Sequence, residues 1–129
     1  MPEFAKAVLE PTVVGAKQPI AVDDTEVSVS GTSETEVKKF TFLKSDLMPF
    51  KILIVQLEGK VSGGTGYFRI YIDGSLKKEL TTTSTSYIPL VCAIDVTDLA
   101  KGSHEFSLRL LNSGSYNTYN RTIEVYGVS

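Results

Sequence analysis

The chain of 129 residues has the length of a single domain, which is long enough to bury a core without cross-links. Its formal net charge is −2 at pH 7 and its charges are scattered, so we expect no nucleic-acid partner. No apolar run is long enough to cross a membrane, so we expect no membrane partner. The first residues lack the pattern of a secretory signal, and the single cysteine, Cys92, excludes an internal disulfide.

Residues 1–25 differ from the rest of the chain, because prolines and a glycine divide them into pieces too short for a strong helix or a regular ladder. They nevertheless carry large apolar side chains, which a solvated tail lacks. We therefore predict an extended N-terminal arm over 1–25, docked on its own domain or on a neighbour, and a β-sandwich domain over 26–129. The docking side chains of the arm are Phe4, Val8, Leu9, Val13, Val14 and Ile20.

From residue 26 onward, short segments alternate between apolar and polar residues with the period of a β-strand. These segments are 26–30, 35–43, 50–61, 66–73, 75–80, 86–95, 103–111 and 118–128. Asp73-Gly74 is the strongest hairpin signal in the chain. One short helical turn is expected at 97–101, capped by Thr97 or Asp95 and ended by Gly102.

This pattern predicts an all-β fold, an antiparallel two-sheet sandwich of the jelly-roll type with about eight strands. The lysine pairs at 38–39 and 77–78 are interpreted as solvated strand ends. The core is expected to contain the apolar faces of three strands. Its predicted members are Phe68, Ile70, Ile72, Phe106, Leu108, Leu110, Ile123 and Val125.

The residues that enzymes use are nearly absent, so we predict no enzyme and no catalytic residue. A serine or cysteine nucleophile needs a base, and His104 is the only histidine. His104 shares a face with Phe106, which is typical of a histidine at the rim of a core. Cys92 lies on an apolar face and is expected to be a buried, inert thiol. One histidine and one cysteine cannot form a zinc site.

We also predict no metal and no cofactor, with calcium as the alternative, because calcium requires only oxygen ligands. No loop has the density of carboxylates that a dedicated calcium motif has. The aspartates that could contribute are Asp23, Asp24, Asp46, Asp73, Asp95 and Asp98. Asn120-Arg-Thr122 matches the glycosylation pattern, which occurs often by chance.

Large side chains occur on both faces of several strands, although a strand covered on one face alternates apolar with polar residues. In segment 50–61 the second face carries Phe50, Ile52 and Ile54. The candidate interface or ligand face consists of Ile52, Ile54, Tyr67, Tyr71 and Tyr126. The N-terminal arm, a neighbouring subunit, or a ligand stacked on the tyrosines would cover it.

Three segments between about Phe50 and Gly127 carry a resemblance to known proteins: GYFRIYIDGS, IDVTDLAKGSHEFSLRLL and YNRTIEVYG. They resemble small jelly-roll structural proteins of tailed phages and archaeal viruses. Such a resemblance implies a capsid decoration (cement) or minor coat protein, located in the virion and made in the host cytoplasm. It further implies self-association, as a homotrimer, and binding to the major capsid protein or another virion protein.

The same turn and closing strands are also similar to those of carbohydrate-binding and galactose-binding-like sandwiches. The alternative function is therefore a sugar-binding module, free-standing or on a host-attachment device, with a glycan as its partner. It is our second choice because such modules usually stack sugars on tryptophan, and this chain has none.

Overall fold

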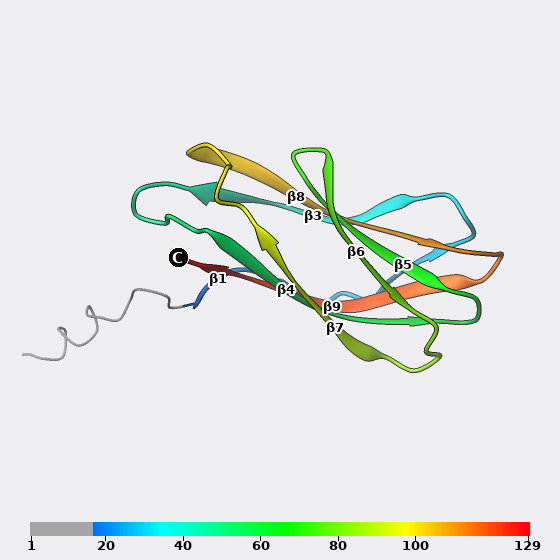
Figure 1. The fold of residues 1–129 in the computed structure, drawn as a ribbon. Coiled ribbons are helices and arrows are strands. Elements are labelled where there is room, and N and C mark those ends of the chain that lie inside the picture. Colours follow the sequence, from blue (N-terminus) through cyan, green and yellow to red (C-terminus); the bar gives the residue numbers. More distant parts are fainter. Residues whose placement is uncertain (1–16) are drawn as a thin grey trace, which may run out of the picture.

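The computed structural model describes residues 17–129, and within this range the chain forms strands, turns and loops with no helix (Figure 1). An antiparallel five-stranded sheet packs on an antiparallel four-stranded sheet. The strands are β1 (Lys17–Asp23), β2 (Val27–Ser30), β3 (Thr35–Lys44), β4 (Ile52–Val61), β5 (Gly66–Ile72), β6 (Ser75–Thr82), β7 (Ile88–Asp95), β8 (Gly102–Asn112) and β9 (Asn117–Val128). This confirms the predicted all-β sandwich. Among these residues no helix could span a membrane.

The strand pairing follows one rule from β2 onward. β2 pairs with β9, β3 with β8, β4 with β7, and β5 with β6, all antiparallel. The chain is therefore one long double strand that is rolled into two sheets, which is the jelly-roll arrangement. The five-stranded sheet has the order β1-β9-β4-β7, with β2 also on β9, and the four-stranded sheet has the order β3-β8-β5-β6.

The predicted strands all exist, with ends that shift by at most two residues. The hairpin at Asp73-Gly74 joins β5 to β6, and both residues have the positive φ angles, 52° and 82°, of the tightest hairpin turns. An additional strand, β1, lies within the predicted arm and pairs with β9. Its Ile20 packs against the core. The other docking side chains named for the arm lie outside the described residues.

The helical turn expected at 97–101 is wrong, because the structure has a single hydrogen-bonded turn there. The N–H of Leu99 donates to the carbonyl of Val96 at 3.1 Å, and no helix follows. The Asp95 carboxylate accepts the N–H of Thr97 at 2.9 Å, so the predicted cap is present without a helix behind it.

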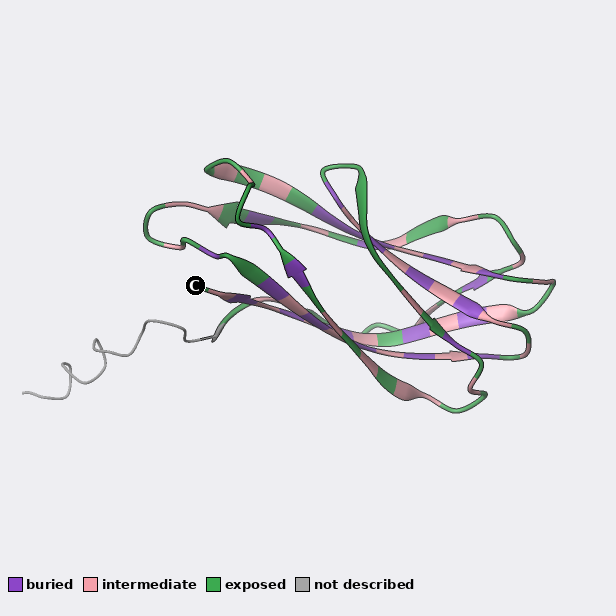
Figure 2. Cartoon of the chain, in the orientation of Figure 1, coloured by how far each residue is buried: buried purple, intermediate pink, exposed green. Residues whose placement is uncertain are grey.

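All eight predicted core residues are buried, which confirms the register of β5, β8 and β9. Buried and less buried residues alternate along these strands (Figure 2). The ring of Phe106 stacks on that of Phe40, with centroids 4.5 Å apart. Gly59 is needed for close packing, because a Cβ at this position would lie 2.3 Å from the ring of Phe68.

Two residues do not lie where they were expected from the sequence. β4 begins at Ile52, so its period does not extend to Phe50, which is buried against Gly127 instead of facing outward. Lys38 is not at a solvated strand end, because it is in phase with Phe40 and Phe42 on the inward side of β3 and is buried. The Lys38 ammonium donates to backbone carbonyls of Asp23 and Arg121 at 3.2 and 3.3 Å.

Candidate functional site

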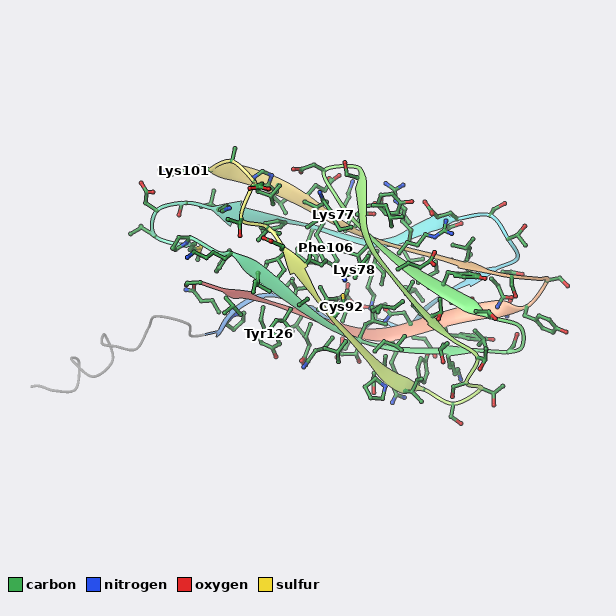
Figure 3. All side chains as sticks on the ribbon, in the orientation of Figure 1. Lys77, Lys78, Cys92, Lys101, Phe106 and Tyr126 are labelled. Carbon is green, nitrogen blue, oxygen red and sulfur yellow. The ribbon has the colours of Figure 1, made fainter. Side chains whose placement is uncertain are left out.

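The structure divides the five candidate face residues between opposite sides of the sandwich. Ile52 and Ile54 on β4 and Tyr126 on β9 lie on the outer face of the five-stranded sheet, where Ile54 and Tyr126 are cross-strand partners. Tyr67 and Tyr71 on β5 lie on the outer face of the four-stranded sheet. Figure 3 shows Tyr126 on the side of its sheet that faces away from Phe106. The five residues therefore do not form one surface.

Arginines and a glutamate of the same chain cover the two tyrosines of β5. The guanidinium of Arg109 lies 4.0 Å from the ring centroid of Tyr71, and that of Arg69 lies 5.8 Å from the ring of Tyr67. The Tyr71 hydroxyl donates to the Glu34 carboxylate at 2.9 Å, which raises the pKa of Tyr71. Arg69 donates to the same carboxylate at 2.9 Å. This internal network accounts for two outward tyrosines without a ligand.

A groove of about 340 Å³ lies on the outer face of the five-stranded sheet, and we call it the outer groove. β4 forms its floor, with β7 on one side and β9 on the other. It is lined by Gln56, Leu57, Glu58, Pro89, Val91, Thr122 and Glu124. Gln56 is the cross-strand partner of Val91 on β7 and of Glu124 on β9, so it lies at the centre of the floor.

A bulge shapes the β9 side of the outer groove. The register of β4 on β9 shifts between Leu57 and Gly59, where β9 carries an extra residue. The fully buried Asn120 holds this bulge from the inner side. Its side-chain amide donates to the carbonyls of Glu58 at 2.9 Å and Thr122 at 3.0 Å. Asn120 therefore fixes the backbone of two residues that line the groove.

The two carboxylates in the outer groove differ in their partners. The Arg121 guanidinium donates hydrogen bonds to both carboxylate oxygens of Glu58, at 2.8 and 3.3 Å, and these bonds lower the pKa of Glu58. Glu124 accepts the Tyr126 hydroxyl at 3.0 Å, which raises the pKa of Tyr126. Across the described part of the chain no cation pairs with Glu124, and the amide of Gln56 has no hydrogen-bond partner. These two groups are therefore open to a ligand.

The same outer face continues beyond the groove in both directions along β4. Toward the start of β4 lies a second depression of about 370 Å³, lined by Lys51, Ile52, Ala93, Asp95 and Thr97. Ile54 and Tyr126 lie between the two depressions, since Ile54 pairs with both Ala93 and Tyr126. The outer face is thus an extended surface of alternating apolar and polar patches.

Two further tyrosines lie at the other end of β4, beyond the outer groove. The Lys60 ammonium lies between the rings of Tyr87 and Tyr119, 4.7 and 4.9 Å from their centroids. Arg121 lies 4.3 Å from the Tyr87 ring. The Tyr87 hydroxyl donates to Glu26 at 2.5 Å, and burial raises the pKa of Tyr87. Fixed aromatic rings therefore border the groove.

His104 and Cys92 lie in different sheets and do not form a catalytic pair. The Nδ1 atom of His104 lies 2.6 Å from the Asp73 carboxylate, and its Nε2 atom lies 2.7 Å from the Ala100 carbonyl. Cys92 is half-buried against the core, and burial raises the pKa of its thiol. His104 lies at the rim of the core, as expected, whereas Cys92 is only partly buried and not fully buried as expected.

The aspartates named for calcium are dispersed. In residues 17–129 no group of three His, Cys, Asp or Glu side chains could hold a metal ion. Asp46 pairs with Lys101 at 2.7 Å, and Asp73 with His104. Asp23 and Asp95 accept backbone N–H groups of Thr25 and Thr97. Asn120 of the glycosylation pattern is fully buried, so its side chain is not accessible for modification.

Sequence reasoning found one edge of this surface and missed its centre. It identified Ile52, Ile54 and Tyr126 because they are large and apolar. It missed Gln56 and Glu124, which are ordinary polar residues on outward positions. The alternation of β4 continues from Ile54 to Gln56 and Glu58, but the pairing with Glu124 is a non-local contact that the sequence does not display.

Comparison with protein-family models and with curated protein sequences finds no match to this chain. Solved structures share its fold. A carbohydrate-binding module, CBM36, in complex with calcium and xylotriose is 15% identical over 85% of this chain and 98% of its own, with a TM-score of 0.54. The C-terminal domain of EclA, described as a sugar-binding protein, is 12% identical over 91% and 84%, with a TM-score of 0.54. Dimeric latent PorU from Porphyromonas gingivalis is 15% identical over 93% of this chain and 13% of its own, with a TM-score of 0.63.

Proposed function

We propose that this protein is a carbohydrate-binding module and that the outer groove takes the sugar chain. The observation that carries this proposal is the pairing of an open amide and an open carboxylate, Gln56 and Glu124, beside an apolar wall on one strand-lined surface. From the sequence we ranked a virion protein above a sugar-binding module. The groove leads us to reverse that order.

The chemistry of the groove suits a sugar. A sugar ring presents hydroxyl groups at its edge and C–H groups on its faces. Gln56 offers both a donor and an acceptor, and the Glu124 carboxylate accepts from hydroxyl groups. Pro89 and exposed Val91 on β7 supply apolar surface for the ring face. A concave surface that combines apolar area with placed polar groups is typical of ligand sites.

The shape of the surface favours an oligosaccharide over a single sugar. From Ile52 to Lys60 on β4, at about 3.3 Å per residue, the outer face extends for roughly 26 Å. Two depressions lie along it, separated by Ile54 and Tyr126. The shared fold of CBM36 and the EclA domain, which are described as binding sugars, supports this proposal at the level of architecture.

A glycan array followed by titration calorimetry of the best binder tests the proposal. We expect binding of one or more oligosaccharides, and a loss of affinity of tenfold or more in a Gln56→Ala, Glu124→Ala double variant. Tyr67→Ala, on the opposite outer face, is the matched control and should bind as the native protein does. Equal affinity in the groove variant, or no binding to any glycan, would contradict the proposal.

The virion location, the homotrimer and the absence of enzymatic activity stay predictions from the sequence. A capsid decoration role needs a partner on the shell and self-association. Light scattering on the purified protein helps to separate the two functions, since a trimer would favour the virion prediction and a monomer that binds a glycan would favour the module.

A further inference from the structure

We infer that the outer groove selects glycans that carry free amino groups, as in polymers of glucosamine, over neutral and acidic glycans. This inference rests on the proposed function and adds the chemical class of the ligand. It starts from the different partners of the two carboxylates in the groove.

Glu58 is already neutralised, because Arg121 binds both of its oxygens. Glu124 accepts one neutral hydroxyl from Tyr126, and no cation of residues 17–129 lies within ion-pair distance of it. The groove lining itself contains no lysine or arginine. Its β9 side therefore carries one uncompensated negative charge next to the open amide of the floor.

A carboxylate of this kind favours a positively charged donor. Hydrogen bonds with an ionised partner are about twice as strong as those between neutral groups. A ligand ammonium at Glu124 would form a hydrogen bond in which both partners are charged, and it would also neutralise the carboxylate. A sugar hydroxyl at the same place would form a hydrogen bond in which only the carboxylate is charged. A uronic acid carboxylate at this place would be repelled. Gln56, directly across from Glu124, accepts or donates with equal ease and does not oppose the preference.

Titration calorimetry with four hexameric probes tests the inference at a pH where the amino groups are protonated. The probes are glucosamine, N-acetylglucosamine, glucose with β-1,4 links, and galacturonic acid oligomers. We expect the glucosamine hexamer to bind about tenfold more tightly than the glucose hexamer, because its donor to the Glu124 carboxylate is itself charged. The galacturonic acid hexamer should bind most weakly.

Two variants separate a specific contact from general attraction of a cation to an acidic protein. Glu124→Gln keeps the size and the acceptor for Tyr126 but removes the charge, and it should abolish the tenfold preference. Glu36→Gln removes the same charge from exposed β3 and should keep the preference. Equal binding of the glucosamine and glucose hexamers, or a preference that survives in Glu124→Gln, would overturn the inference and leave the proposed function standing. No binding of any probe would count against both.

Discussion

Single side chains in this protein act mainly by fixing backbone segments that other residues use. Asn120 is the clearest case, because it is fully buried and binds two carbonyls under the outer groove. Its own Oδ1 atom has no partner among the described residues, which is a cost for a buried oxygen. The amide contacts must outweigh this cost, which identifies the bulge as the feature that Asn120 maintains.

Replacing Asn120 with alanine should therefore destabilise the fold. Two part-buried carbonyls would lose the donor that they share, and the loss of a donor to buried groups costs about 1–3 kcal/mol in total. Urea unfolding should show a loss in this range, whereas Gln56→Ala, with no protein hydrogen bond at its amide, should change the free energy of unfolding by less than about 0.5 kcal/mol. If the two variants unfold at the same urea concentration, Asn120 does not clamp the bulge.

His104 makes stability depend on pH. Both ring nitrogens face acceptors, Asp73 and the Ala100 carbonyl, so the doubly protonated imidazolium satisfies both contacts. The Ala100 carbonyl, followed by Asp73, raises the pKa of His104 above its usual 6.5, against the opposing effects of burial and, to a smaller extent, of Lys44. A raised pKa in the folded state gives stability that is fully present below about pH 6.5 and is lost as pH rises through the folded value.

Thermal unfolding between about pH 5 and pH 8 measures this effect. The native protein should lose stability across the upper half of that range relative to His104→Asn, which cannot titrate there. Parallel curves for the two proteins would show that the imidazolium contributes nothing.

At the scale of elements, different residues hinder each sheet edge from pairing with a strand of another chain. The edge strand β6 carries Lys77 and Lys78, whose labels lie beside it in Figure 3, and the edge strand β7 carries Pro89. Lysine and proline on an edge discourage pairing with another chain. On the other side of the five-stranded sheet, β1 covers β9 and carries Pro19 with a register shift beside it. The edges formed by β1, β6 and β7 therefore do not favour assembly by strand addition.

The contribution of β1 can be isolated by comparing two shortened chains. One begins at residue 17 and the other at residue 23, so that both keep Asp23 as the partner of buried Lys38. The shorter chain lacks the pairing of 17–22 with β9 and the packing of Ile20, and should lose about 1–3 kcal/mol. Equal unfolding midpoints would show that β1 adds nothing to the sandwich.

The sequence was sufficient for most elements because the strands alternate with period two. Phe68, Ile70 and Ile72 identify their own buried face without any knowledge of their neighbours. β1 escaped prediction because Pro19 and the short spacing removed its alternation, and its existence depends on pairing with β9. The burial of Lys38 was missed because lysines are usually exposed, although Lys38 shares the alternation of Phe40 and Phe42.

At the scale of the whole molecule, the sequence does not show to which of the two outer faces an outward residue belongs. Tyr71 and Tyr126 have the same local pattern, but non-local pairing puts them on opposite sides of the sandwich. On the four-stranded sheet, Tyr71 donates a hydrogen bond to Glu34 and its ring is covered by Arg109. On the five-stranded sheet, the outer groove leaves an amide and a carboxylate open. We therefore propose different roles for the two outer faces, with ligand binding at only one of them.

Chemical-shift mapping on the nitrogen-15-labelled protein tests this central claim most directly. On titration with the oligosaccharide that binds best, we expect the amide signals of Gln56, Val91 and Glu124 to shift, with those of Tyr67 and Tyr71 unchanged. Shifts confined to β5 and β8, or none at saturating oligosaccharide, would contradict the assignment of glycan binding to the outer groove.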